Sequence, residues 1–190
     1  MSVCIVGNGK SILSHEYGSK IDSFDTVIRI NTFKIEGFEK HVGTKTDIFA
    51  TSAWSHLVHN KHIDLTDEIW LTRPMNKKLI PPWWIGVMRG TIKKYNLGIN
   101  QEVSADTWKQ LKKNLGQKLS SNYAPSSGIV AMLMAIDNFQ DDISVVGFDF
   151  FKKPHYYPKK EEDVRWHEMK KEKEYFETLL QSCIIRKLKP

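Results

Sequence analysis

Two histidines in the last third of the chain lie beside residues that suit proton transfer. His155 is followed by Tyr156 and Tyr157, and His167 precedes Glu172 with four residues between them. The imidazole ring changes charge near neutral pH, so both are candidate acid–base residues. Most isolated histidines are nevertheless ordinary surface or core residues. The other five have no motif around them and are expected to be structural: His15, His41, His56, His59 and His62.

A glycine-containing turn follows the first apolar segment and could hold a phosphate group. The sequence Gly7-Asn-Gly-Lys-Ser11 directly follows residues 3–6. A P-loop would need glycine at Cys4, and a dinucleotide-binding fingerprint would need glycine at Ile12, so both motifs fail. The turn can still present backbone N–H groups to a phosphate, or it can simply be a tight turn.

A second candidate anion site is the sequence Ser126-Ser-Gly128, which opens an apolar helical pattern over residues 129–138. The first N–H groups of a helix have no partner within the helix, and the helix dipole is positive at that end. Such a start is suited to binding a phosphate group.

No motif predicts a metal site. The segment from His167 to Lys171 begins like the zinc-protease motif, but the second ligand position holds Lys171. The sequence has no Asp-x-Asp pair, and no Cys and His residues have zinc-ligand spacing. We therefore expect no metal and no cofactor, although scattered carboxylates could still meet in space.

Short β-rich segments alternate with helical patterns, which is typical of an α/β sheet covered by helices on both faces. Strands are predicted over residues 3–6, 25–31, 46–51, 68–72 and 142–147. Helices are predicted over residues 105–115, with Ser104 as N-cap and Gly116 as the stop, over 129–138, and over 161–180. Residues 75–100 contain Pro81, Pro82 and three glycines and are expected to be irregular.

The composition predicts one globular domain over residues 1–190, because 41% of the residues are hydrophobic and 26% are charged. The two cysteines, Cys4 and Cys183, are expected to be reduced thiols. No apolar run is long enough to span a membrane, and the N-terminus lacks the features of a signal peptide. The net charge of +6 is compatible with nucleic acid, an anionic membrane or an anionic small substrate.

Four segments in order resemble the sialylmotifs of the sialyltransferases, glycosyltransferase family 29. The long motif matches Val-Gly-Asn at residues 6–8, Ile-Asp at 21–22, Val-Ile-Arg-x-Asn at 27–31, Gly-Phe-Glu at 37–39, Val-Gly at 42–43 and Lys-Thr at 45–46. The short motif matches residues 125–128 and Gly147-Phe148, and the last two match His155-Tyr-Tyr157 and His167 with Glu172. The resemblance spans most of the chain.

This resemblance implies a single Rossmann-like α/β domain with a mostly parallel sheet, a variant of the GT-A type. It implies a metal-independent, inverting transfer of sialic acid from CMP-sialic acid to a glycan hydroxyl, with His167 as the general base and His155 near the donor phosphate. On an ideal helix His167 and Glu172, five residues apart, are rotated by about 140° and do not form one pair, so Glu172 is expected to be structural. The donor-binding positions that it implies are Asn8, Gly9, Ser11, Asn31, Ser126, Ser127, Gly128, Gly147, Phe148 and Tyr156.

Departures from the family pattern leave alternatives open. The membrane anchor and stem of the animal enzymes have no counterpart here, and their disulfide between the two main motifs is absent. A cytoplasmic enzyme is therefore expected, with peripheral contact to the inner face of a membrane as an option, and a trimmed catalytic fragment fits the same departures. The donor could be another CMP-linked 2-keto sugar such as Kdo, or the protein could bind nucleotide or glycan without turnover.

The partners are expected to be a CMP-sugar and a glycan or glycolipid. Lys and Arg are dispersed among acidic residues, which argues against nucleic acid. The sequence does not identify the acceptor or the oligomeric state. Trp54, Trp83 and Trp84 could stack on an acceptor sugar, and packing in a core or lid is an equal alternative.

Overall fold

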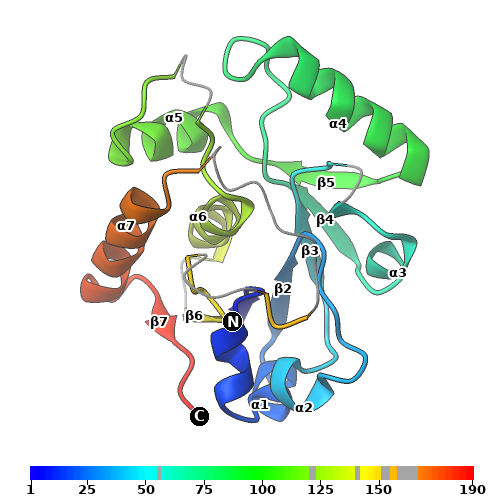
Figure 1. The fold of residues 1–190 in the computed structure, drawn as a ribbon, viewed down its shortest axis with the longest axis vertical. Coiled ribbons are helices and arrows are strands. Elements are labelled where there is room, and N and C mark those ends of the chain that lie inside the picture. The colour runs from blue at the N-terminus through cyan, green and yellow to red at the C-terminus, as the bar shows by residue number, and fades with distance from the viewer. Residues whose placement is uncertain (55–56, 120–122, 140–141, 151–154, 158–166) are drawn as a thin grey trace.

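The structure is a computed structural model, and it describes all residues except 55–56, 120–122, 140–141, 151–154 and 158–166. Its centre is a seven-stranded parallel sheet with strand order β5-β4-β3-β2-β1-β6-β7 (Figure 1). The strands are β1 Val3–Val6, β2 Thr26–Ile30, β3 Ile48–Thr51, β4 Glu68–Leu71, β5 Ile99–Glu102, β6 Ile143–Val146 and β7 Arg186–Lys187. The strand order reverses between β1 and β6, and ligands of open α/β sheets bind at the carboxyl ends of the strands at such a point.

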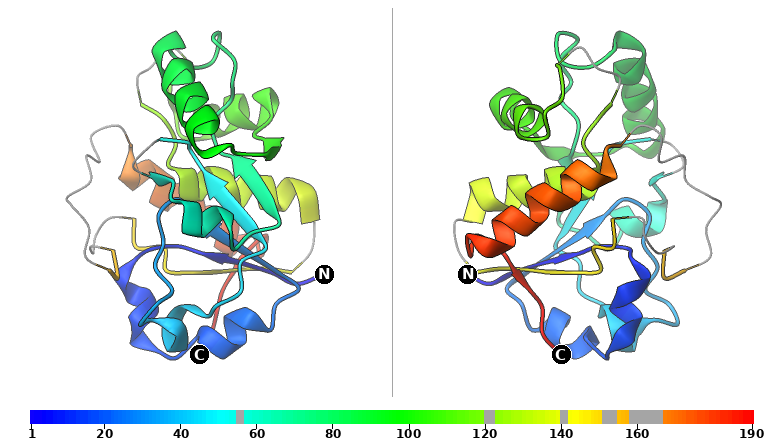
Figure 2. Two further views of the ribbon diagram at one scale, coloured as in Figure 1. Left: turned by 90° about the vertical axis from the view of Figure 1, so that its right-hand side faces the viewer. Right: turned by 60° about the vertical axis from the view of Figure 1, so that its left-hand side comes forward.

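Helices cover both faces of the sheet (Figure 2). The helices are α1 Gly18–Asp22, α2 Glu39–Val42, α3 Asn60–Ile63, α4 Pro82–Tyr95, α5 Ala105–Asn114, α6 Ser127–Phe139 and α7 Met169–Gln181, with a 3₁₀ helix η1 Lys10–Ser14. The helices α4 to α7 pack on one face, and η1, α1, α2 and α3 lie on the other.

Alternation along the strands explains this double covering. Val3 and Ile5 of β1 face the α6 side, whereas Cys4 and Val6 face η1 and α1, and all four side chains are buried. Successive side chains of a strand point to opposite faces, so a strand buried on both faces is apolar throughout. The two cysteines are free thiols, as predicted: Cys4 is buried and Cys183 is exposed.

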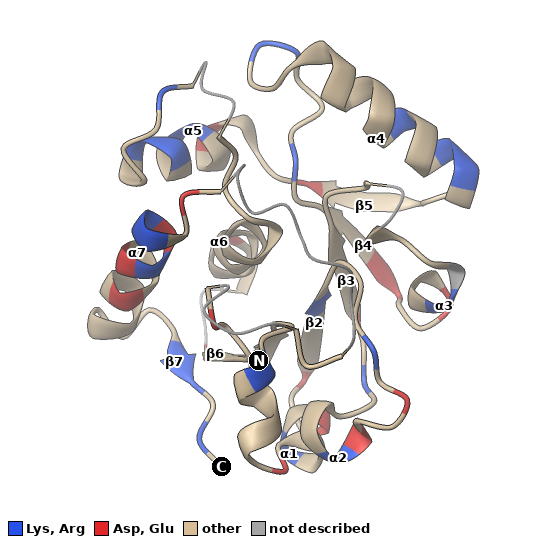
Figure 3. Ribbon diagram, viewed as in Figure 1, with Lys and Arg blue, Asp and Glu red and all other residues tan. Residues whose placement is uncertain are grey.

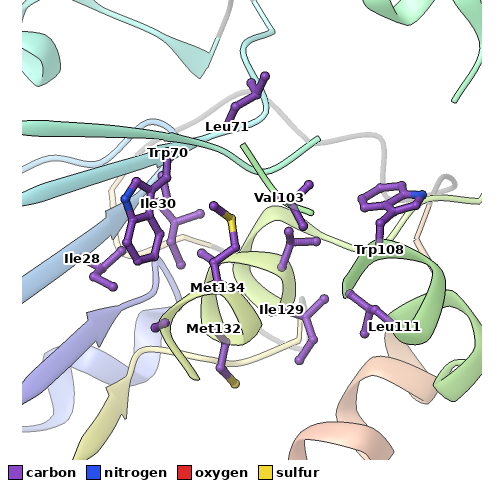
Figure 4. Close-up of a cluster of buried hydrophobic side chains, with 14 of the residues drawn as sticks. Ile28, Ile30, Trp70, Leu71, Val103, Trp108, Leu111, Ile129, Met132 and Met134 are labelled. Carbon is purple, nitrogen blue, oxygen red and sulfur yellow. The ribbon is translucent and has the colours of Figure 1, made fainter. Parts of the chain in front are cut away.

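The largest core cluster lies between the sheet and α6 (Figure 4). Trp70 and Ile28 from the sheet meet Met134 of α6, and Trp108 of α5 lies at the other end of the cluster with Leu111. The helix α6 contacts β1, β2 and β3, so its N-terminus is fixed relative to the carboxyl ends of these strands.

The five predicted strands are present within one or two residues of the expected bounds. The helix α5 has the predicted N-cap, because Ser104 Oγ accepts a hydrogen bond of 2.9 Å from the Thr107 N–H. The edge strand β7 was not predicted by the sequence patterns.

The prediction that residues 75–100 are irregular is wrong, since they contain α4 and β5. Pro82 begins the helix instead of breaking it, because proline is tolerated where the N–H would have no partner. Gly86 and Gly90 lie inside the helix with open space around them, so they interrupt the pattern without breaking the structure.

The predicted helix over residues 161–180 also needs correction. Residues 161–166 lie outside the described residues, and α7 begins at Met169, so His167 precedes the helix. The relation of His167 to Glu172 therefore cannot be taken from ideal helix geometry.

In the described part of the chain, no helix is long and apolar enough to cross a membrane. Acidic and basic residues are mixed on α5 and α7 (Figure 3).

Candidate functional site

The loops that follow β1 and β6 are locked together where the strand order reverses. The Gly9 N–H donates to the Gly147 carbonyl oxygen over 2.8 Å, and the Gly7 N–H donates to the Val146 carbonyl oxygen over 2.8 Å. A Cβ atom on Gly7 would lie 2.4 Å from the Gly147 oxygen, and Gly147 has a φ of +72°. Only glycine fits both positions, because the two backbones touch and one adopts a left-handed conformation. Next along the chain, the Ser11 N–H donates to Asp149 Oδ2 over 2.8 Å, which closes the unit.

Asn8 joins this unit to the end of β2. Its Nδ2 group donates to the carbonyl oxygens of Ile30 and Thr32 over 2.9 and 3.0 Å. Both partners can only accept, so the amide orientation follows from chemistry. Its Oδ1 atom has no hydrogen-bond partner among the described residues, so it remains an acceptor for a ligand hydroxyl or amine.

The His155-Tyr-Tyr157 segment lies against the same loop. His155 forms an antiparallel bridge with Gly9, and the Tyr156 N–H donates to the Asn8 carbonyl oxygen over 3.1 Å. The rings of His155 and Tyr157 are stacked with centroids 5.4 Å apart. The structure thus brings His155 to the β1 loop, although the two are about 146 residues apart.

Tyr156 is buried, and its hydroxyl bonds to the backbone of Lys34, accepting from its N–H over 3.1 Å and donating to its carbonyl over 2.6 Å. The Tyr157 hydroxyl donates to the Thr32 carbonyl oxygen. Burial raises the pKa of Tyr156, so the phenol stays protonated. These contacts support a positioning role for Tyr156, and direct donor binding by this side chain remains a prediction.

Asn31 connects the end of β2 to the end of β3. It has a φ of +50°, and its Oδ1 atom accepts a hydrogen bond of 3.1 Å from the Ser52 N–H. Asparagine tolerates the left-handed region better than most residues. Asn8 bonds to the residues on either side of Asn31, and Asn31 bonds to Ser52, so these contacts link the carboxyl ends of β1, β2 and β3.

The start of α6 presents unpaired backbone donors at this edge. In the part of the chain that the structure describes, the N–H groups of Ser127, Gly128 and Ile129 have no hydrogen-bond partner. A Cβ on Gly128 would lie 3.1 Å from the ring of Phe148, which itself stacks on Phe176 of α7. Phe148 thus holds the first turn of α6 against β6, and this turn has the geometry of an anion site.

Ser126 is bonded to Glu172, and its predicted contact with the nucleotide stays a prediction. Its N–H donates to Glu172 Oε1 over 2.8 Å, and its hydroxyl donates to Glu172 Oε2. Both of its hydrogens are therefore used within the protein, and a nucleotide could meet only a lone pair of Ser126. Glu172 is fully buried, and its structural role stays a prediction.

Arg73 and Lys112 are two buried cations that the motifs do not indicate. The Arg73 guanidinium lies over the Trp108 ring at 5.3 Å and is 4% exposed, and Lys112 is 2% exposed. Burial lowers the pKa of Arg73 to about 10, and the carboxylate of Glu172 acts in the opposite direction. Burial raises the pKa of Glu172, and Ser126 and Arg73 oppose this shift. The only signal for Arg73 in the sequence is an arginine just after the apolar strand β4.

His167 contacts residues 124–126, the segment that leads into α6. Its Nδ1 atom is 2.7 Å from the Ala124 carbonyl oxygen, and because a carbonyl only accepts, Nδ1 carries the hydrogen. The Nε2 atom then carries the lone pair, as a general base requires. Ala124 binds His167 and Ser126 binds Glu172, so both ends of the 124–126 segment are held by residues around the start of α7.

The described residues contain no group of three or more His, Cys, Asp and Glu side chains that could hold a metal ion. A hollow of about 230 Å³ lies beside β6 and α7, where it is lined by Phe148, Asp149, Phe150, Lys173, Phe176, Glu177 and Lys187. Its lining shares Phe148 and Asp149 with the site but includes neither candidate histidine.

Comparison with solved structures agrees with this architecture. A mammalian sialyltransferase superimposes with a TM-score of 0.70 at 19% identity, covering 99% of this chain and 68% of that one. The sialyltransferase CstII from Campylobacter jejuni, in complex with the substrate analogue CMP-3FNeuAc, gives a TM-score of 0.64 at 18% identity, with coverage of 98% and 80%. At these identities the likeness establishes the fold.

Sequence comparison adds the family. The CMP-N-acetylneuraminate-beta-1,4-galactoside alpha-2,3-sialyltransferase of Rattus norvegicus is 29% identical over 225 aligned residues, which cover 97% of this chain and 56% of the relative. A beta-1,6-galactosyltransferase of Arabidopsis thaliana is 48% identical over 48 residues, 25% of this chain. The chain thus spans only about half the length of the rat relative. The model of glycosyltransferase family 29 (sialyltransferase) matches residues 2–184, and the chain belongs to this family.

Proposed function

We propose that the protein transfers sialic acid from CMP-sialic acid to a hydroxyl group of a galactoside, with inversion, without a metal ion, and with His167 as the general base. The rat relative is named for this donor and a beta-1,4-galactoside acceptor. The observation that carries the proposal is the 124–126 segment, which binds His167 at one end and leads into the N-terminus of α6 at the other. A base and an anion site are thereby held by three consecutive residues.

The base acts on the acceptor. His167 Nε2 removes the proton of a galactose hydroxyl, because Nδ1 already donates to Ala124. The oxygen then forms a bond to C2 of sialic acid, and the bond from C2 to the phosphate oxygen breaks on the opposite face. The proton stays on His167, the electron pair leaves with CMP, and the configuration at C2 is inverted.

The departing phosphate needs positive charge or donors. The N–H groups of Ser127, Gly128 and Ile129 at the start of the 13-residue helix α6 supply donors and the positive end of the dipole. His155, which is bridged to Gly9, is the proposed side-chain donor to the same phosphate. A phosphate monoester carries less charge than a diphosphate, so these groups are proposed to replace a metal ion.

The second candidate function is the same type of transfer with a different sugar donor. The short match to a beta-1,6-galactosyltransferase indicates that similarity to this family does not by itself fix the sugar. CMP-Kdo remains an alternative because it also carries a 2-keto sugar on CMP.

The test is to incubate the protein with CMP-sialic acid, CMP-Kdo or UDP-galactose, with and without lactose, and to measure the released nucleotide. We expect CMP release from CMP-sialic acid, faster with lactose, and unchanged in EDTA. No release from any donor would contradict the enzymatic function. Loss of release in EDTA would contradict only the metal-independent mechanism.

The His167→Ala variant tests the base, with His15→Ala, an exposed histidine on the η1 side, as control. His167→Ala is expected to lose transfer while CMP affinity in calorimetry stays within about threefold, because the donor is bound by other groups. Loss of CMP binding in this variant would contradict the assignment of the base.

A further inference from the structure

Three tryptophans, Trp54, Trp83 and Trp84, form an aromatic cluster that the proposed chemistry does not use. The ring centroids of Trp54 lie 6.0 Å from Trp83 and 6.3 Å from Trp84, and those of Trp83 and Trp84 lie 5.5 Å apart. The three pairs are edge-to-face, with interplanar angles of 78°, 75° and 90°. This is a preferred geometry for aromatic pairs, so the cluster holds its own shape.

One tryptophan of the cluster is buried in the core, and another is exposed to solvent. Trp84 is 6% exposed and belongs to the main core together with Ile85 and Met88 of α4. Trp83, its neighbour in the first turn of α4, is 56% exposed. A large, rigid and half-exposed indole on a fixed base is a binding surface that loses little conformational entropy when a ligand stacks on it.

The cluster lies on the same sheet edge as the donor site. Trp54 follows the carboxyl end of β3, two residues after Ser52, whose N–H donates to Asn31 Oδ1. Asn8 binds on either side of Asn31, at Ile30 and Thr32. Strands in a sheet are about 4.8 Å apart and β2 lies between β1 and β3, so the ends of β1 and β3 are separated by roughly 10 Å across the carboxyl end of β2.

An indole face selects a particular ligand chemistry. A galactose ring presents one face of C–H groups, and this face can cover an aromatic ring while the hydroxyl groups remain in water. Isolated exposed tryptophans need no special explanation, but here the exposed ring is fixed by two others at the edge where the donor is proposed to bind.

We propose that Trp83, held by Trp54 and Trp84, is the stacking platform for the galactose ring of the acceptor. The inference rests on the proposed function and adds the residues that select the acceptor. It places the sugar over β3 with its reactive hydroxyl directed along the sheet edge toward the donor site.

The test separates acceptor binding from donor chemistry. In Trp83→Ala, the KM for lactose is expected to rise about fivefold, the scale of one aromatic contact, while kcat changes little. Release of CMP from CMP-sialic acid without acceptor is expected to be unchanged. Trp83→Tyr, which keeps an aromatic face, is expected to recover most of the wild-type KM.

Ile184→Ala serves as the control, since Ile184 is 44% exposed and follows α7. It is expected to leave every parameter unchanged. Saturation-transfer NMR of lactose provides a readout without turnover: the wild type should label one face of the galactose ring, and Trp83→Ala should lose this signal.

A wild-type protein without CMP release would overturn the proposed function. A wild-type protein with normal transfer, together with an unchanged lactose KM in Trp83→Ala, would overturn only the platform.

Discussion

Glu172 and Ser126 are 46 residues apart in the chain, yet one buried carboxylate accepts both hydrogens of the serine. This contact fixes where α6 begins relative to α7 and therefore relative to His167. A hydrogen bond to a charged acceptor is about twice as strong as a neutral one, and here water is excluded. Arg73 is a buried positive charge whose field, together with the Ser126 hydrogen bonds, opposes the rise in the pKa of Glu172 caused by burial. The donor helix and the proposed base are thus positioned by one buried polar network.

The first prediction is that Arg73 and Glu172 are energetically coupled. Arg73→Met and Glu172→Gln are each expected to lower the free energy of unfolding by on the order of 3 kcal/mol, because each leaves a buried charge uncompensated. The double variant is expected to lose less than the sum, by about 1–2 kcal/mol. Urea unfolding of the four proteins measures this coupling.

Glu174→Gln is the control, because this residue lies on the exposed side of the same helix. It should change the free energy of unfolding by less than about 0.5 kcal/mol. Strict additivity of the two buried substitutions would contradict the network.

The sequence predicts the strands of the sheet, but it does not predict the buried contact between Ser126 and Glu172. Strands such as β1 and β6 are continuous apolar segments, so their pattern reveals them, and parallel strands bring Asn8 and Gly147 to one edge. The helix α4 was not predicted from the sequence because Pro82, Gly86 and Gly90 are local signals of irregular structure. The packing of Trp84 and Met88 on the core overrides these signals. The direction of the Ser126 hydroxyl depends on the burial of Glu172, which is a long-range property without a local pattern.

The second prediction concerns the glycine contact between the β1 and β6 loops. Gly147→Ala is expected to destabilise the protein by at least about 2 kcal/mol, because a Cβ would lie 2.6 Å from the Gly7 oxygen and φ is +72°. CMP affinity should fall with it, since the loop that carries Asn8 must move. Gly90→Ala, in open space on α4, should stabilise the protein by about 0.5–1 kcal/mol. Thermal unfolding and calorimetry with CMP compare the two variants, and a stable Gly147→Ala protein with normal CMP affinity would refute the close contact.

The third prediction is a pH dependence of stability that arises from His62. This side chain is 1% exposed, its Nε2 lies 3.0 Å from the Phe33 carbonyl oxygen, and burial lowers its pKa from 6.5 to about 4. Between pH 6.5 and about 4, His62 binds a proton in the unfolded chain but not in the folded protein. The contribution of His62 is therefore fully present above pH 6.5 and is lost as the pH falls toward about 4.

His62→Gln should show a smaller fall in Tm between pH 7 and pH 4.5 than the wild type, because glutamine has no proton to gain and can still donate to Phe33. Equal slopes in wild type and His62→Gln would show that the buried imidazole does not titrate as described.

The fourth prediction uses the two free cysteines as reporters of the sheet. The Cys4 thiol is buried in β1, and burial raises its pKa to about 12, so almost no thiolate exists at neutral pH. Cys183 is exposed. Iodoacetamide at pH 8 should therefore add one group to the native protein and two to the urea-unfolded protein, as measured by intact mass, and Cys183→Ser should reduce the native count to zero.

Slow labelling of Cys4 requires β1 to open, and β1 leads directly into the loop of Asn8 and Gly9. CMP should slow this labelling in proportion to its occupancy, since a ligand of the folded state opposes opening. Rapid labelling of Cys4 in the native protein, or labelling that saturating CMP does not slow, would mean that β1 and the proposed donor site do not open as one unit.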